Sequence, residues 1–213
     1  MTAIEIKNLS KSFGDNTIIN NLTVTISTGT ITSIMGSSGN GKSTLLKLIT
    51  GQESFEGKIN ILGLDINNSK KDIYIKMGVS MDELGIYQNF TAKENILFFA
   101  KMFGVEKSKA DDMLKKFGLD KDKNKKVKKF SKGMKQRLSL AVSMLKDPDI
   151  LILDEPHTGL DEKNRELVNN LLTEIKNKGK TVIITTHSNE DAIQISDTIY
   201  ELSKGSLINK EVA

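Results

Sequence analysis

Cysteine is absent from the sequence, proline occurs only twice, and no long apolar run is present. Without cysteine the chain cannot build a disulfide scaffold, a thiolate metal site or a cysteine nucleophile. The longest apolar stretches, such as ILFFA at 96–100, fall far short of the roughly 20 residues that a membrane-spanning helix needs. The first residues also lack the basic start and apolar core of a signal peptide. We therefore expect a cytoplasmic protein, or one that reaches the inner face of a membrane only through a partner.

What is present is the composition of a globular protein. Hydrophobic residues make up 38% and charged residues 27% of the 213 residues, enough for one large domain or one domain with an insertion. The net charge of +4 is mild, and much of it lies in KDKNKKVKK, Lys121–Lys129. Such a run is more typical of a solvated surface than of a nucleic-acid site, so we expect no nucleic-acid partner.

The hydrophobic pattern changes character twice along the chain. Short strands are predicted first, a helical stretch occupies roughly 85–145, and strand–helix alternation then returns. The predicted strands lie at 3–9, 21–27, 30–35, 57–66, 149–154, 181–186 and 197–202, and the predicted helices begin near Lys42, Thr91, Lys107, Ser131, Asp161 and Ser188. Strands that alternate with helices imply an α/β fold with a mostly parallel sheet. We expect a single domain over 1–213, with an N-terminal antiparallel β portion, a core of about 1–84 and 146–213, and an inserted helical lobe.

A glycine-rich loop, GSSGNGKST, lies between a predicted strand and a predicted helix. It matches the spacing G-x-x-x-x-G-K-[ST], in which glycines let backbone N–H groups cradle phosphates while the lysine and the helix N-terminus add positive charge. A glycine-rich turn is the alternative, but a chance match in this length is on the order of one in a hundred given usual glycine usage. The loop predicts nucleotide binding by Gly36, Ser37, Ser38, Gly39, Asn40, Gly41, Lys42, Ser43 and Thr44.

Two adjacent carboxylates end the apolar run ILILDEPHTGLD, Ile150–Asp161. In phosphate-loop ATPases a carboxylate on a second strand holds Mg²⁺ opposite the loop Ser/Thr, which predicts Asp154 and Ser43 as ligands. Glu155 then faces the terminal phosphate, where it could orient or deprotonate the attacking water. The alternative is a pair of acids on an exposed strand end. We expect ATP and Mg²⁺, a P-loop NTPase core, and catalysis by Glu155 with Lys42.

The order and spacing of five motifs resemble the nucleotide-binding subunit of an ABC transporter. Beyond the two motifs above, FSKGMKQRL at 130–138 and IITTH at 183–187 carry the resemblance, which covers essentially the whole chain. It implies that two subunits meet head to tail and sandwich two ATP molecules. The residues that it adds to the ATP site are Ser131 and Gly133 of the signature motif, Asp161 of the loop that touches the other subunit, the catalytic His187, and Phe13 against adenine.

The sequence also departs from the family pattern. The signature usually reads L-S-G-G-Q, whereas here Lys132 and Met134 replace two of its residues. By alignment from Gly78, Asp82 stands where the family places a magnesium-contacting glutamine. An acid here and S-x-G-M-K-Q-R in the signature resemble bacterial transporters that expel antimicrobial peptides, so Asp82 is a third candidate magnesium ligand, the alternative being a solvent-facing loop residue. His157 matches no family role and is expected to be an exposed loop residue.

The resemblance implies an ATPase subunit that powers a separately encoded transmembrane permease, with export of a peptide or hydrophobic antimicrobial as the favoured direction. The ATPase pair is a homodimer or a heterodimer. The alternative is a soluble ABC-type ATPase that acts on a ribosomal or DNA-associated partner. A module that binds ATP without useful hydrolysis is disfavoured by the intact Glu155 and His187.

Overall fold

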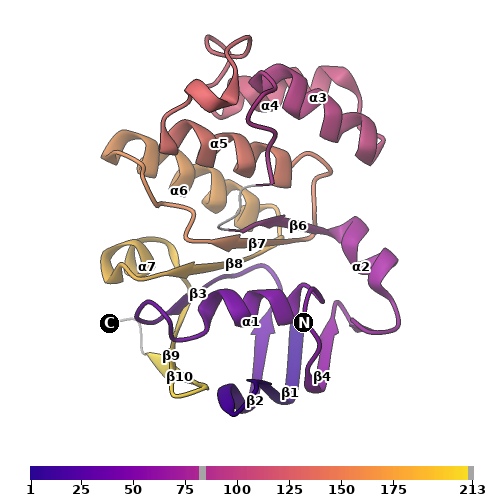
Figure 1. Ribbon diagram of the computed structural model, residues 1–213, viewed down its shortest axis with the longest axis vertical. Coiled ribbons are helices and arrows are strands. Elements are labelled where there is room, and N and C mark those ends of the chain that lie inside the picture. The colour runs from indigo at the N-terminus through magenta and orange to yellow at the C-terminus, as the bar shows by residue number, and fades with distance from the viewer. Residues whose placement is uncertain (82–84, 211–213) are drawn as a thin grey trace.

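The computed structural model describes residues 1–81 and 85–210, and these contain two β-sheets (Figure 1). The smaller sheet is antiparallel and has the order β2-β1-β4-β5. Its strands are β1 (Thr2–Phe13), β2 (Asn16–Ser27), β4 (Glu56–Ile61) and β5 (Leu64–Asp65). Burial alternates along the second half of β2, as expected for a sheet with one face on the core. The predicted N-terminal antiparallel portion is confirmed.

The larger sheet is parallel except at one edge. Its order is β10-β9-β3-β8-β7-β6, and only β10 runs antiparallel to its neighbour. The strands are β3 (Ile31–Met35), β6 (Met77–Ser80), β7 (Ile150–Asp154), β8 (Thr181–Thr186), β9 (Thr198–Ser203) and β10 (Ser206–Lys210). Every residue of β7 and β8 is buried, because helices cover both faces of these central strands (Figure 1). The predicted α/β class with a mostly parallel sheet is therefore confirmed.

Side-chain caps begin most of the helices near where the sequence predicts them. Thr91 and Glu94 form a reciprocal capping box, and Ser131, Asp161 and Ser188 each accept a hydrogen bond from a backbone N–H of the first turn. The helices are α1 (Lys42–Ile49), α2 (Lys70–Lys76), α3 (Ala92–Phe103), α4 (Lys107–Lys116), α5 (Lys132–Ser143), α6 (Glu162–Asn177) and α7 (Asn189–Ile195), and Val127–Lys129 forms a short 3₁₀ turn.

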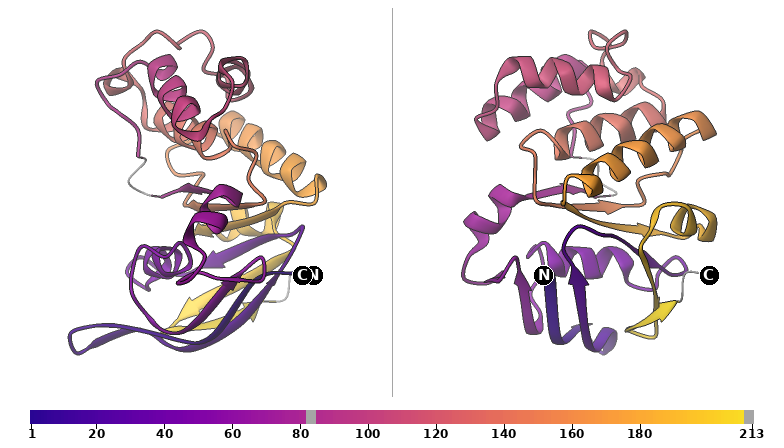
Figure 2. Two further views of the ribbon diagram at one scale, coloured as in Figure 1. Left: turned by 90° about the vertical axis from the view of Figure 1, so that its right-hand side faces the viewer. Right: turned by 180° about the vertical axis from the view of Figure 1, so that it is seen from behind.

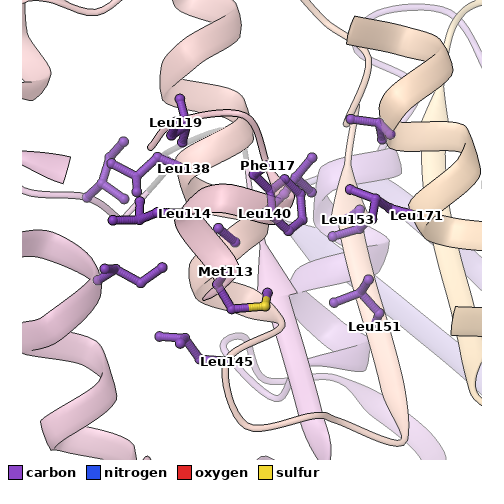
Figure 3. Packing of buried hydrophobic residues seen from close by; sticks show 14 of the residues in the cluster. Met113, Leu114, Phe117, Leu119, Leu138, Leu140, Leu145, Leu151, Leu153 and Leu171 are labelled. Carbon is purple, nitrogen blue, oxygen red and sulfur yellow. The ribbon is translucent and has the colours of Figure 1, made fainter. Parts of the chain in front are cut away.

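The helices α3, α4 and α5 lie together above the sheet (Figures 1 and 2). They share one hydrophobic cluster with β7, β8 and α6. Figure 3 shows Phe117, from the end of α4, among Leu140 of α5 and Leu153 of β7. The predicted lobe therefore packs onto the sheet through a continuous apolar core. A second cluster fills the space between the two sheets and α1.

One α-helix and two strands were not predicted from the sequence. Helix α2 and strand β6 adjoin at Met77, and β10 completes a hairpin with β9. All three are short or polar, so periodicity carries little signal for them. In β6 a Cβ on Gly78 would lie 2.2 Å from the Ser143 carbonyl oxygen, so this strand depends on a close approach of α5. Across the described residues, no helix combines the length and apolarity needed to cross a membrane.

Candidate active site

The glycine-rich loop joins β3 to α1, as its motif predicts. Gly41 has φ of 92°, and a Cβ there would lie 2.6 Å from Cγ2 of Ile18, so only glycine fits without strain. Within the described chain, no side chain caps the N-terminus of α1. Its first-turn N–H groups have no acceptor within the helix, and together with the helix dipole they form a site for an anion.

A cavity of about 460 Å³ opens beside this loop. It is lined by Phe13, Ile18, Ser38, Gly39, Gly41, Lys42, Ser43, Thr44, Asp154 and Glu155. Most of the residues predicted from the sequence therefore come together in one place. Three other residues of the loop do not line this cavity. Gly36 and Ser37 line a neighbouring cavity together with His187. The Asn40 side chain donates to the Leu202 carbonyl at 3.2 Å.

The cation and the two acids converge on this cavity. Lys42 is buried, and its Nζ donates to the Gly36 carbonyl at 2.6 Å and lies 3.8 Å from Oε1 of Glu155. The Ser43 hydroxyl donates to Oδ2 of Asp154 at 2.7 Å. The loop and the end of β7, more than a hundred residues apart in sequence, are thus in direct contact.

Thr185 forms hydrogen bonds with both Asp154 and Glu155. It was not singled out from the sequence. Its hydroxyl donates to Oδ1 of Asp154 and accepts a hydrogen bond from the Glu155 N–H at 3.0 Å. Thr185 is fully buried on β8, where it pairs with Asp154 in the sheet register. The available signal was the threonine pair before His187. The contact of Thr185 with Asp154, however, depends on the register of two strands that are distant in sequence.

Glu155 is fixed by its neighbours on the exposed side of the cavity. Oε2 lies 3.1 Å from Nδ1 of His187 and accepts a hydrogen bond from the Thr158 hydroxyl at 3.1 Å. The backbone of Glu155 has φ of 45°, a left-handed conformation that is costly for a residue with a side chain. The strand therefore ends in a sharp turn that directs this carboxylate toward Lys42 and His187.

Ser43 and Asp154 fit a magnesium ion of the kind that accompanies a nucleotide. Mg²⁺ takes few protein ligands, because phosphate oxygens and waters complete its octahedron. Asp154 is 4% exposed, and its Oδ2 faces Ser43 at the cavity wall, so a cation there would offset the cost of a buried carboxylate. Among the described residues, no group of three acidic or histidine side chains could hold a metal. Asp82, the third candidate ligand, lies outside the described residues.

The signature residues form a separate cluster away from the cavity. Ser131 caps α5, and Gly133 in its first turn lies against the loop that follows Glu155: a Cβ on Gly133 would be 2.8 Å from the Gly159 carbonyl oxygen. Asp161 caps α6, and the hydrogen bonds from Asn164 hold the pKa of its carboxyl below the usual value. Ser131, Gly133 and Asp161 do not line the cavity of this chain.

His157 is buried, so the expectation of an exposed loop residue was wrong. Its side chain is 3% exposed, with Nε2 2.7 Å from Oδ1 of Asn169 and Nδ1 3.9 Å from Oδ2 of Asp191. Burial lowers the pKa of the imidazole. The residue is inside because the segment after β7 folds back onto α6 and α7, which a local reading of the sequence cannot show.

Comparison with known proteins shows the family of the chain. Residues 19–158 match the family described as ABC transporter. The chain is 35% identical over 206 residues to the lantibiotic transport ATP-binding protein SrtF of Streptococcus pyogenes, covering 96% of this chain and 89% of that protein. It is 33% identical over 211 residues to the bacitracin transport ATP-binding protein BcrA of Enterococcus faecalis, covering 97% and 68%.

A solved structure extends the agreement to the whole fold. The dimeric structure of the ATP-binding cassette MJ0796, bound to ADP and Pi in a post-hydrolysis state, superposes with a TM-score of 0.87. It is 27% identical to this chain, and the match covers 99% of both chains. The chain belongs to the ATP-binding subunits of ABC transporters, and it is an ATP hydrolase.

Proposed function

We propose that the chain hydrolyses ATP in the cavity beside the glycine-rich loop and uses this reaction to drive a separately encoded membrane permease. The observation that carries the proposal is the convergence of Lys42, Ser43, Asp154 and Glu155 on one cavity. A cation, a hydroxyl, a buried acid and an acid at the cavity mouth are the groups that phosphoryl transfer requires.

Each side chain receives a distinct role in this proposal. Lys42 and the N–H groups of the loop and α1 bind the phosphates. Mg²⁺, held by Ser43 and Asp154 with Asp82 as a third candidate, would neutralise charge that develops on the phosphate oxygens. Glu155 orients the attacking water or accepts its proton. His187, 3.1 Å from Glu155, positions that carboxylate and contacts the terminal phosphate.

Phe13 is proposed as the adenine platform. Its side chain is 50% exposed at the rim of the same cavity, so Phe13 is not a core residue. The Nζ of Lys11 lies 4.7 Å from the centre of its ring. An aromatic face open to solvent at a nucleotide cavity favours base stacking.

Two copies are proposed to face each other head to tail. The cluster of Ser131, Gly133 and Asp161 lies outside the cavity of its own chain, yet the N-terminus of α5 favours an anion. In a head-to-tail pair this cluster would face the terminal phosphate bound by the other subunit. The dimeric arrangement of the similar cassette MJ0796 supports the pairing. The partner is an identical copy or a related subunit.

Residues 85–145 are proposed to form a helical subdomain on a core of 1–84 and 146–213, with a groove between them for the permease. A cavity of about 250 Å³ lies between β6, α3 and α5, and Tyr74, Phe99 and Phe103 are among the residues that line it. Close by, Tyr87, Phe90 and Phe98 are exposed and in ring contact. Exposed apolar side chains gathered at a groove favour a protein partner.

The transported molecule is proposed to be a peptide or hydrophobic antimicrobial, moved outward, with the chain held at the inner face of the membrane by its permease. The names of two relatives, a lantibiotic and a bacitracin transport protein, support this class of transported molecule. Asp82 and the altered signature support it independently, since both resemble that group of exporters.

Hydrolysis is tested by Glu155→Gln, which keeps the side-chain shape and removes the base. We expect ATP binding to persist and phosphate release to fall by 10²-fold or more, as for the loss of a general base. Glu162→Gln, at an exposed position on α6, is the matched control and should hydrolyse ATP at the wild-type rate. Equal turnover in the Glu155 variant and wild type would remove Glu155 from the chemistry.

The permease is tested by affinity capture of the tagged chain from gently solubilised native membranes. Recovery of a multi-span membrane protein in near-equal amount supports the transporter. Recovery of only ribosomal or DNA-associated proteins contradicts it and leaves the ATPase chemistry in place.

A further inference from the structure

Positive charge is concentrated in one part of the chain. Residues 85–145 contain 15 basic and six acidic residues, a net charge of +9, whereas the whole chain carries +4. The remaining residues are therefore acidic in sum. Six lysines of this excess lie in one short segment before α5, which we call the basic strip: Lys121, Lys123, Lys125, Lys126, Lys128 and Lys129.

The basic strip is held in a fixed place by its backbone. The N–H of Val127 donates to the Phe90 carbonyl and that of Lys128 to the Gln88 carbonyl, both at 2.8 Å, and the Val127 side chain is fully buried. Lys126 pairs with Thr91 in an isolated bridge. Anchoring through main chain and valine leaves the lysine side chains to point outward, so the charge is displayed on a rigid support.

The lysines of the strip have little local compensation. Lys121, Lys125, Lys126, Lys128 and Lys129 are exposed. Across 1–81 and 85–210, the one ion pair within 4 Å that involves the strip joins Lys125 to Asp122 at 3.7 Å. Cations this close together repel one another, and an external polyanion relieves that repulsion.

The position of the strip indicates which polyanion it meets. It adjoins the exposed aromatic residues Tyr87 and Phe90, and the segment between α4 and α5 lies at the end of the molecule opposite β1 and β2 (Figures 1 and 2). With the aromatic patch against a permease, the strip would lie beside the permease at the inner membrane surface. Clustered lysines close to that surface are attracted by the headgroups of anionic lipids.

We propose that the basic strip binds anionic phospholipid headgroups and so holds the helical lobe against the membrane beside the permease. The proposal rests on the proposed function for its place in the cell. The binding itself requires only the chain and an anionic lipid surface, and it is salt-sensitive because it is electrostatic.

The test is sedimentation of the full chain with vesicles that contain no permease. Vesicles of phosphatidylcholine alone are compared with vesicles of phosphatidylcholine and phosphatidylglycerol in equal parts. We expect binding to the anionic vesicles only, and its loss at high salt. Replacing Lys121, Lys126 and Lys128 by Glu should weaken it roughly 100-fold or more, since each lysine near an anionic surface contributes roughly a fivefold factor.

The matched control replaces three exposed lysines outside the lobe, Lys47, Lys58 and Lys204, by Glu. This control has the same change in net charge as the strip variant. Its affinity for anionic vesicles should stay well above that of the strip variant. Equal binding by the two variants, or equal binding to both kinds of vesicle, overturns the proposal, as does preference of the same lysines for duplex DNA over lipid. ATP hydrolysis is measured on the same samples and should stay at the wild-type rate, so a failure of lipid binding and a failure of the ATPase are seen separately.

Discussion

Thr185→Val should separate the stability of the active site from its chemistry. Valine has nearly the shape of threonine but cannot donate to Asp154 or accept from the Glu155 N–H. Both groups are left without their partner in a region where Thr185 itself is fully buried. An unsatisfied buried polar group costs about 1–3 kcal/mol, and in a chain of this size each kcal/mol lowers Tm by about 2–4 °C.

The effect on turnover should be larger than the loss of stability explains. Thr185 orients both the acid proposed to hold the metal and the acid proposed to act on water, and loss of such supporting contacts costs roughly 10- to 100-fold in activity. The assay is steady-state phosphate release at a temperature well below the Tm of each variant, together with nucleotide affinity. We expect kcat to fall and ATP affinity to change less.

A control on the same strand makes this prediction decisive. Thr181, at the opposite end of β8, is also buried, and its hydroxyl accepts from the Gly29 N–H at 3.1 Å. Thr181→Val should lose comparable stability and keep its turnover, and Thr185→Ser should recover most of the activity because the hydroxyl returns. The reasoning is refuted if Thr185→Val hydrolyses ATP at the wild-type rate, or if both valine variants lose turnover equally.

Three further predictions concern other parts of the molecule. Gly133→Ala places a Cβ 2.8 Å from the Gly159 carbonyl oxygen, so it should destabilise the chain by about 1–3 kcal/mol. Urea unfolding measures this loss, and an unchanged midpoint contradicts the close contact. Burial lowers the pKa of His157 from its unfolded value near 6.5, so below that pH the unfolded chain binds more protons and stability falls as pH decreases. The free energy of unfolding of His157→Gln should fall less than that of the wild type between pH 7.5 and 5.5. An equal fall contradicts the assignment. Two lysines, Lys116 and Lys178, lower the pKa of Glu174 to about 2, but because these groups are exposed and screened, Glu174→Gln should cost at most about 1 kcal/mol, and a larger loss in thermal unfolding contradicts this.

Local chemistry made much of the fold and site predictable. Capping residues such as Thr91 and Ser131 bind backbone groups within one helical turn, so a few neighbouring residues of the sequence are enough to predict them. The glycine-rich loop is equally local, because its backbone conformation requires glycine at a defined place such as Gly41. The apolar strand that ends at Asp154 is recognisable for the same reason.

What was missed depends on packing between distant segments. Thr185 meets Asp154 only because β7 and β8 pair in one register, and His157 is buried only because α6 and α7 cover it. The close approach of Gly133 to the loop at Gly159 likewise arises from packing of α5 against a segment about 25 residues away. Periodicity and propensity report single elements, so they leave such contacts undetermined.

The contact between Gly133 and Gly159 has a mechanical consequence. The chain from Glu155 to Asp161 is short and fixed at both ends, by the Thr185 hydrogen bond to the Glu155 N–H and by the cap of α6. Within this segment, the Leu160 N–H donates to the His157 carbonyl at 3.2 Å, which closes a turn. These contacts restrict the conformations open to the seven residues, and α5 packs against them at Gly159. A shift of the α5 N-terminus therefore bears on the segment that begins at Glu155, so the position of the helical lobe and the placement of this carboxylate are linked through one short loop.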